Sequence, residues 1–186
     1  MSRLVVKEMS IPDVKLLMPS IFSDSRGYFM ETYNLQEMRT LGVDAVFCQD
    51  NESSSMKGVL RGLHYQMPPY MQAKLVRVVK GAVFDVAVDI RQGSPTFGKF
   101  VAVTLTEENK QQLYIPRGFA HGFLVLEDNT IFSYKCDSFY NPLSERGICF
   151  NDPAIGIAWP DVGIPFILSD KDRKNVRLNE ADTFYN

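Results

Sequence analysis

Short apolar runs, rich in β-branched and aromatic side chains, alternate with turn residues from about residue 57 to residue 137. Such runs, bounded by Gly, Pro, Asn and Asp, predict β-strands. Within the third run, Phe84, Val86 and Val88 occupy every second position and would share one face, whereas Asp85 and Asp89 would share the other. The predicted strands cover residues 59–64, 74–79, 82–89, 100–106, 111–115, 122–126 and 130–136. This succession predicts an all-β sandwich or jelly-roll barrel.

Little helix is expected. Residues 34–41 fit one short helix, with Asn34 as N-cap and Glu37 three residues further on. About the last forty residues contain Pro153, Pro160 and Pro165, which favour irregular chain or short helical turns laid against the barrel. A barrel of this kind would admit a ligand at its mouth.

Length and charge narrow the class of protein. The 186 residues are 45% hydrophobic and contain no repeat or linker, so residues 1–186 are expected to form one jelly-roll domain. A net charge of −2 argues against nucleic acid as a partner, and no segment approaches the about 20 apolar residues that span a bilayer. We therefore expect a cytoplasmic protein without a membrane partner. Cys48, Cys136 and Cys149 are expected to be reduced, buried thiols.

The chain has two histidines, and both lie among glycines and apolar residues. His64 follows Gly58-Val59-Leu60-Arg61-Gly62-Leu63, and His121 lies in Gly118-Phe119-Ala120-His121-Gly122-Phe123. Imidazole has an unperturbed pKa close to neutral, so His64 is a candidate general base. The alternative is an ordinary core histidine without a chemical role.

Two kinds of chemistry fit an all-β barrel with these histidines. A metal-binding cupin would need several imidazoles and a carboxylate closing on one ion, and the sequence offers no second histidine near His64. Acid–base chemistry needs a base, an acid and a fixed cation. Tyr134 is a candidate acid, and Arg61 and Lys74 are candidate cations, although each is also compatible with core packing or surface exposure. Because Arg61 and His64 would face opposite ways in a regular strand, Gly62 is expected to form a bulge.

Several segments, in order along the chain, closely resemble the dTDP-4-dehydrorhamnose 3,5-epimerase family, and the resemblance runs from residue 11 to about residue 178. The matching segments are residues 22–31 (FSDSRGYFME), 49–53 (QDNES), 58–66 (GVLRGLHYQ), 74–77 (KLVR), 84–91 (FDVAVDIR), 94–98 (SPTFG), 115–123 (IPRGFAHGF), 151–153 (NDP) and 168–172 (LSDKD). One departure is Phe150, where the family often has tryptophan.

The resemblance implies a cupin-like jelly roll that forms a homodimer, uses no cofactor and no metal, and acts on dTDP-4-dehydro-6-deoxy-D-glucose on the pathway to dTDP-L-rhamnose. It implies that His64 is the proton acceptor and that Asp172 orients it. Tyr134 would be the proton donor, and Lys74, helped by Arg61, would stabilise an enolate oxygen.

The resemblance also implies a set of substrate-binding residues. Tyr140 would stack on the thymine ring, and Arg26 and Glu31 would reach into the site of the partner subunit. The remaining members of the set are Gln49, Asp50, Asn51, Arg61, His121, Glu145 and Lys171.

Two alternatives stay open at this point. A relative that inverts only one carbon of a 4-keto-6-deoxysugar nucleotide would keep the same base, acid and cations. A non-catalytic barrel that binds a sugar nucleotide would not need His64, Asp172 and Tyr134 together. The sequence does not separate thymidine from uridine carriers.

Overall fold

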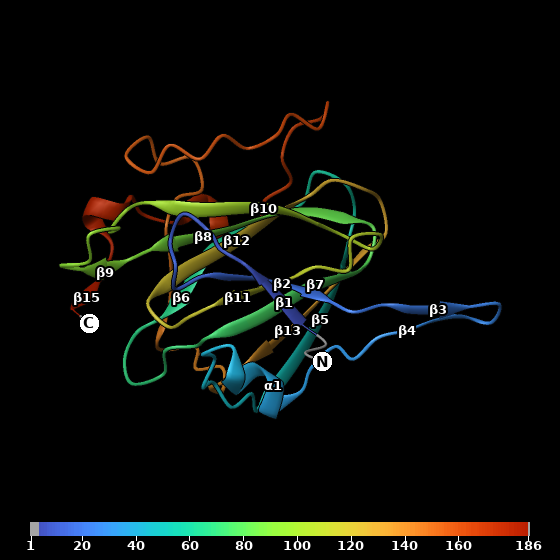
Figure 1. The fold of residues 1–186 in the computed structure, drawn as a ribbon. Helices are drawn as coiled ribbons and strands as arrows, with labels where there is room; N and C mark the ends of the chain where they lie inside the picture. The colour runs from blue at the N-terminus through green and yellow to red at the C-terminus, as the bar shows by residue number, and fades with distance from the viewer. Residues whose placement is uncertain (1–3, 186) are drawn as a thin grey trace.

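The computed structural model describes residues 4–185, which are built mainly from two antiparallel sheets packed face to face (Figure 1). The six-stranded sheet has the order β1 (Leu4–Lys7), β2 (Lys15–Pro19), β11 (Gln112–Ile115), β7 (Lys74–Lys80), β13 (Thr130–Cys136) and β5 (Gln49–Ser55). The five-stranded sheet has the order β10 (Phe100–Thr106), β8 (Ala82–Asp89), β12 (Phe119–Val125), β6 (Leu60–Gln66) and β14 (Glu145–Gly147). The predicted all-β jelly roll is confirmed.

Smaller elements surround the two sheets. Strands β3 (Phe22–Asp24) and β4 (Gly27–Phe29) form a hairpin that projects away from the barrel (Figure 1). Strand β9 (Arg91–Gln92) pairs in parallel with β15 (Phe184–Tyr185) near the C-terminus. The helices are α1 (Leu35–Thr40) and the 3-10 helices η1 (Asp172–Lys174) and η2 (Leu178–Glu180). Within residues 4–185, no helix has the length and apolar character needed to cross a membrane.

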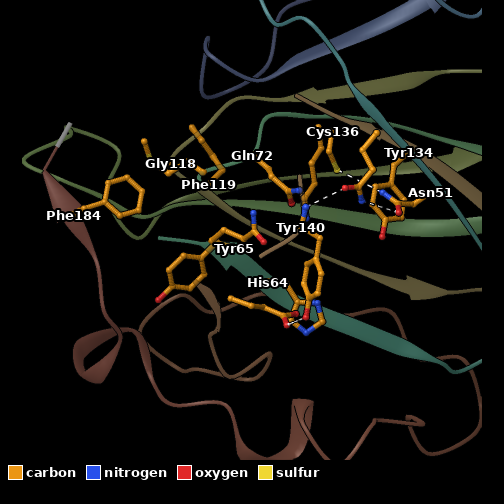
Figure 2. Close-up of a pocket in the computed structure, with 15 residues that line it drawn as sticks. Asn51, His64, Tyr65, Gln72, Gly118, Phe119, Tyr134, Cys136, Tyr140 and Phe184 are labelled. Carbon is orange, nitrogen blue, oxygen red and sulfur yellow. Dashed lines mark hydrogen bonds between the residues drawn. The ribbon is translucent and has the colours of Figure 1, made fainter. Parts of the chain in front are cut away.

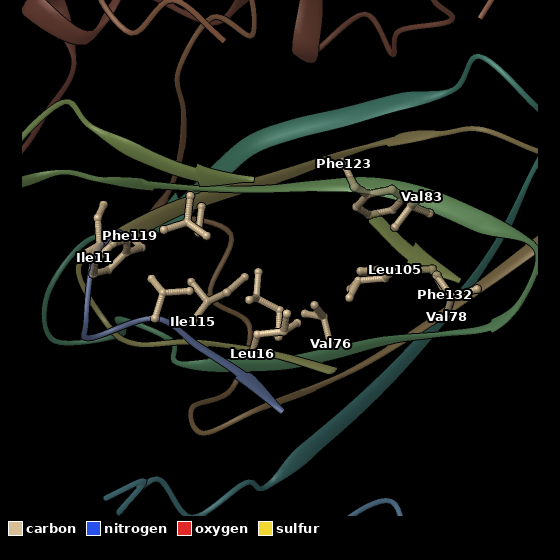
Figure 3. Packing of buried hydrophobic residues seen from close by; sticks show 14 of the residues in the cluster. Ile11, Leu16, Val76, Val78, Val83, Leu105, Ile115, Phe119, Phe123 and Phe132 are labelled. Atoms are coloured by element: carbon tan, nitrogen blue, oxygen red, sulfur yellow. The ribbon is translucent and has the colours of Figure 1, made fainter. Parts of the chain in front are cut away.

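The main core lies between the sheets, as Figure 3 shows. Val76 and Phe132 come from the six-stranded sheet, and Val83, Leu105 and Phe123 come from the five-stranded sheet. All five are at least 95% buried, so removing any of them would leave a cavity between the layers. This core fixes the distance between the sheets and therefore the frame in which the polar side chains of the barrel sit.

Both faces of β8 are buried, and they follow the predicted alternation. Val86 and Val88 belong to a second apolar cluster, with Ile155 and Leu178 of the C-terminal segment, and Phe84 packs against it. Figure 1 shows this segment lying over the five-stranded sheet. The opposite face of β8, which carries Asp85, points into the barrel interior, where a carboxylate requires a partner.

The strand predictions differ in accuracy. The bounds of β8, β10 and β13 agree with the sequence, whereas β12 begins three residues earlier than expected, at Phe119. The seven residues of β5 were not predicted as a strand, because the sequence Gln-Asp-Asn-Glu-Ser-Ser-Ser contains no apolar residue.

The expected helix and cysteines can also be compared with the structure. Asn34 caps α1, since its side-chain oxygen accepts hydrogen bonds from the backbone N–H groups of Gln36 and Glu37 at 3.0 and 3.3 Å.

The three cysteines are free thiols, as predicted. Their expected burial holds for Cys136 but is wrong for Cys48, which is exposed, and only partly right for Cys149.

Candidate active site

A β-bulge in β6 brings Arg61 and His64 to the same side of the sheet. His64 lies opposite His121 and Arg61 lies opposite Phe123, so Gly62 and the residue after it oppose the single Gly122. Gly62 has φ +129°, and a Cβ there would lie 2.5 Å from the Cα of Gly122. Glycine is therefore required, and the bulge predicted at Gly62 is confirmed.

Two adjoining cavities open between the sheets on this side of β6. The larger cavity, about 280 Å³, and the smaller cavity, about 130 Å³, share His64, Lys74 and Tyr134 as lining residues. Figure 2 shows side chains of the larger cavity converging from both sheets. Of the predicted site residues, the larger cavity also contains Gln49, Asn51, Tyr140 and Glu145, and the smaller cavity also contains Arg61 and His121.

His64 is hydrogen-bonded to Asp172, the first residue of η1, with 2.5 Å between Nε2 and Oδ1. Ser169 fixes this carboxylate by donating its hydroxyl to Oδ2 at 2.7 Å. Burial opposes ionisation of Asp172, but the hydrogen bonds from His64 and Ser169 outweigh it and hold the pKa of Asp172 below its ordinary value. A carboxylate here selects the tautomer with the proton on Nε2 of His64, which leaves Nδ1 free to accept a proton.

His121 forms a second histidine–aspartate pair, deeper in the barrel. Its Nε2 lies 2.9 and 3.1 Å from the two oxygens of Asp85, and both residues are buried. Burial lowers the pKa of His121, although Asp85 opposes the shift. Sequence reasoning did not assign Asp85 to the site; its signal was a carboxylate within an apolar strand whose two faces are buried.

Lys74 and Tyr134 lie on neighbouring strands, β7 and β13, and the ammonium of Lys74 is 5.9 Å from the centre of the Tyr134 ring. Burial lowers the pKa of Lys74, while nearby Cys136 and two carboxylates oppose that shift. Burial raises the pKa of Tyr134, so this phenol stays protonated at neutral pH. The pair thus offers a cation and a proton donor beside His64.

Tyr140 and Glu145, two of the predicted binding residues, line the larger cavity, and Lys171 pairs with Glu145 there. The Tyr140 hydroxyl donates to Oε2 of Glu145 at 2.6 Å, and Lys171 forms an ion pair with the same oxygen. Burial works against ionisation of Glu145, yet these two contacts lower its pKa. Tyr140 is 54% exposed, so one face of its ring is available to a ligand.

Alternation along β5 divides its three predicted residues. Gln49 and Asn51 point into the larger cavity, where the side-chain amide of Gln49 donates to Oδ1 of Asn51 at 3.0 Å. Asp50 points the other way and forms an ion pair with Lys135 at 2.9 Å, so the structure does not place it in either cavity.

Arg26 and Glu31 also lie away from both cavities of their own chain. Arg26, on the β3–β4 hairpin, has a side chain that is 88% exposed and pairs with Asp24 at 2.5 Å. Glu31 follows the hairpin and accepts a hydrogen bond from Asn34 at 3.0 Å.

Several lining residues were not anticipated from the sequence. Cys136 and Gln66 line the larger cavity, and burial raises the pKa of the Cys136 thiol to about 11. Cys136 lies two residues after Tyr134 on β13, and this period-two spacing could have placed both on one face. Ser53 lines the smaller cavity; it lies in the matching segment 49–53, but no role was assigned to it from the sequence. Among the described residues, no three His, Cys, Asp or Glu side chains are arranged to hold a metal ion.

The jelly roll and this acid–base site define a cupin-like barrel with the groups needed to move a proton on a small polar ligand. The family model described as dTDP-4-dehydrorhamnose 3,5-epimerase matches residues 8–180, and the chain belongs to this family of isomerases. The resemblance seen in the sequence is thereby confirmed.

Individual relatives agree with this assignment. A dTDP-4-dehydrorhamnose 3,5-epimerase of Shigella flexneri is 54% identical over 96% of this chain and 98% of its own. The crystal structure of a dTDP-6-deoxy-D-glucose-3,5-epimerase from Legionella pneumophila, in complex with dTDP-4-keto-L-rhamnose, superposes with a TM-score of 0.93 at 48% identity, covering 96% of this chain and 95% of that one. A 3′-monoepimerase from Streptomyces bikiniensis, in complex with dTDP-quinovose, has a TM-score of 0.86 at 38% identity, with coverage of 92% and 87%.

Proposed function

We propose that this protein inverts carbons 3 and 5 of dTDP-4-dehydro-6-deoxy-D-glucose, giving dTDP-4-dehydro-L-rhamnose for dTDP-L-rhamnose synthesis. The observation that carries the proposal is the His64–Asp172 pair, whose imidazole lines one cavity together with Lys74 and Tyr134. The substrate's ketone at carbon 4 acidifies the C–H bonds on both neighbouring carbons. One set of groups can therefore act on either carbon.

His64 is the base of the proposed reaction. Its Nδ1 removes the proton from carbon 3 or carbon 5, and the electron pair of that C–H bond moves to form an enolate on the carbon 4 oxygen. The carboxylate of Asp172, 2.5 Å from Nε2, stabilises the imidazolium that results and keeps the ring in place.

Lys74 and Arg61 stabilise the enolate. Both line the smaller cavity with His64, so their positive charges lie close to the base and can act on the developing oxyanion. Tyr134 then donates its proton to the opposite face of the same carbon, which inverts it. Tyr134 regains a proton and His64 loses one to solvent before the second carbon reacts. The sequence of steps is redox-neutral, and the proposal therefore includes no cofactor.

The mouth of the larger cavity is proposed to bind the nucleotide. Tyr140 offers a flat ring for the thymine, and Lys171 offers a positive charge for the pyrophosphate. Gln49, Asn51 and Glu145 complete the polar lining there. His121 is proposed to bind the sugar from the smaller cavity. The predicted role of Asp50 would require it to leave Lys135, and it stays a prediction.

We also propose a homodimer in which the β3–β4 hairpin completes the partner's site. The hairpin projects from the barrel, and Phe22, Tyr28 and Phe29 on it are more than half exposed. Arg26 and Glu31 would thus act on the substrate held by the other subunit.

Mixing Arg26→Ala and His64→Asn proteins tests this arrangement, because hybrid dimers should regain activity that neither parent has. No recovery in a confirmed mixed dimer would contradict it. The cytoplasmic location stays a prediction.

The decisive experiment for the activity is proton NMR of dTDP-4-dehydro-6-deoxy-D-glucose incubated with the protein in deuterated water. Deuterium at carbons 3 and 5, with the doubly inverted product, is the expected result. No exchange at either carbon would contradict the proposal and leave a binding role.

The second candidate is a monoepimerase of a related 4-keto-6-deoxysugar nucleotide. It is favoured by one observation: the 3′-monoepimerase relative shares this fold over 92% of the chain. Exchange and inversion at a single carbon in the same NMR experiment would establish it. Since the same base and acid serve both reactions, the shape of the cavity around the sugar decides between them.

A further inference from the structure

The hydroxyl of Ser53 stands out from the other polar groups of the barrel. Within residues 4–185, Ser53 Oγ is the buried side-chain nitrogen or oxygen that has no hydrogen-bond partner. Buried hydroxyls in folded proteins are nearly always hydrogen-bonded, since losing water without replacement is unfavourable. An exception of this kind calls for a physical explanation, and a ligand that supplies the missing hydrogen bond is one.

The position of Ser53 on β5 explains why the protein itself supplies no partner. Residues 49, 51, 53 and 55 share the inward face of this strand, and the residues between them are exposed. Asn51 is bonded to Gln49, and Ser55 accepts from Arg61 at 3.3 Å. Opposite Ser53 on β13 lies Phe132, whose ring cannot replace a hydrogen-bond partner. Of the polar side chains on the inward face of β5, Ser53 is therefore the one that lacks a hydrogen bond.

That residue lines the smaller cavity. Ser53 shares this cavity with Arg61, His64, Lys74, His121 and Tyr134. Three of these, His64, Lys74 and Tyr134, also line the larger cavity, so a ligand that touches them lies at the junction of the two. The smaller cavity, about 130 Å³, has room for part of a pyranose ring but not for a nucleotide.

We propose that Ser53 Oγ hydrogen-bonds an oxygen on the hexose ring of the substrate and helps to position the ring between base and acid. This inference rests on the proposed function and adds a specificity residue to it. A hydroxyl can donate to a keto oxygen or accept from a sugar hydroxyl, so it suits either kind of substituent. It would not contact the nucleotide.

Ser53→Ala is the test, with Ser54→Ala as the matched control. Ser54 is the next residue on the same strand and is exposed on the opposite face. Turnover of dTDP-4-dehydro-6-deoxy-D-glucose is measured first for the wild type and then for both variants. Binding of dTDP and of the unreactive sugar nucleotide dTDP-glucose is measured by calorimetry, and melting temperatures are recorded.

We expect Ser53→Ala to lower kcat/KM about 10-fold, the effect of losing one neutral hydrogen bond. Binding of dTDP-glucose should weaken while binding of dTDP is unchanged, and the free protein should melt no earlier than the wild type. Ser54→Ala should behave as the wild type in every measurement.

Three results would overturn the inference. The first is unchanged kcat/KM in Ser53→Ala while the wild type turns over, which would leave the proposed function standing. The second is an equal loss of dTDP and dTDP-glucose binding, which would mean that Ser53 acts on the nucleotide or on the fold. The third is no turnover by the wild type, which would overturn the proposed function and this inference with it.

Discussion

The two histidine–aspartate pairs of the barrel are built from the same side chains and lie opposite each other on adjacent strands, yet they differ in their access to solvent. The His64 side chain is 28% exposed and faces the junction of the two cavities, whereas the His121 side chain is 6% exposed. Their aspartates differ in origin, since Asp172 comes from the C-terminal segment and Asp85 from the adjacent strand β8.

A histidine–carboxylate pair therefore does not by itself define a base. Burial lowers the pKa of His121 despite its aspartate, because a charged imidazole is unfavourable inside the barrel. A neutral, fixed imidazole suits the binding of a sugar hydroxyl. His64, placed where substrate and water reach it, suits proton exchange.

The largest expected effect comes from removing each imidazole in turn. His64→Asn should lower kcat about 1,000-fold, since a general base contributes about 10² to 10⁴. His121→Asn should cost about 10-fold in kcat/KM, as the loss of one binding hydrogen bond does. Steady-state kinetics measure both, with circular dichroism as the check on folding. Equal losses would show that the two pairs share the chemistry.

Removing the two carboxylate charges should separate the pairs further. Asp172→Asn is expected to lower kcat about 100-fold with little change in KM, because His64 loses its tautomer and its counter-charge. Asp85→Asn should instead lower the free energy of unfolding by about 1–3 kcal/mol, since it disturbs a buried hydrogen bond. Kinetics and urea unfolding of both variants provide the comparison. A larger kcat loss for Asp85→Asn would reverse the assignment.

Lys74 lines the smaller cavity with both histidines, and its charge is one of the influences that lower the pKa of His121. Because burial lowers the pKa of Lys74 from 10.5, the alkaline limb of the kcat/KM profile should fall below pH 10.5. Deprotonation of Tyr134 would give a limb above pH 10.0, since burial raises its pKa, so a variant at Lys74 is needed to separate the two groups. In Lys74→Arg any residual activity should lose this limb, because arginine keeps its charge. An unchanged limb in that variant would assign it to another group.

The smallest expected effect is on stability at mildly acidic pH. Unfolded chains protonate histidine below about pH 6.5, while burial keeps folded His121 neutral to lower pH. The unfolded state therefore binds more protons in that window, and stability falls as the pH drops through it. His121→Asn should flatten this fall by on the order of 1 kcal/mol. Urea midpoints at pH 7.5 and 5 measure it, and an unchanged slope would contradict neutral burial of His121.

Much of the frame follows from apolar periodicity. Strands β8, β10 and β13 could be predicted to the residue because β-branched side chains pack on both of their faces or against the core. Strand β5 could not, since its polar side chains form a strand only by pairing with β13 beside a polar cavity. Its register depends on a neighbour some eighty residues away in sequence, as in the pairing of Ser53 with Phe132.

The residues of the site likewise divide into those that the sequence could predict and those that it could not. Arg61, His64 and Gly62 lie within four residues, and local strand geometry was enough to predict the bulge. The link from His64 to Asp172 spans 108 positions, and only the family resemblance suggested it. Asp85 and Ser53 lie within matching segments of the family, residues 84–91 and 49–53, but the sequence assigned them no role, because their importance arises from burial in three dimensions.

The contact between Gly62 and Gly122 bears on whether a related barrel sequence is assigned to the epimerases or to the binding proteins. A Cβ on Gly62 would lie 2.5 Å from the Cα of Gly122, and one on Gly122 would lie 2.7 Å from the Arg61 carbonyl oxygen. Neither glycine can change alone without rebuilding the strand pair that holds Arg61 and His64 on one side. The two glycines together are therefore a structural fingerprint: a barrel that keeps the histidine but loses either of them should be sorted with the binding proteins rather than the epimerases.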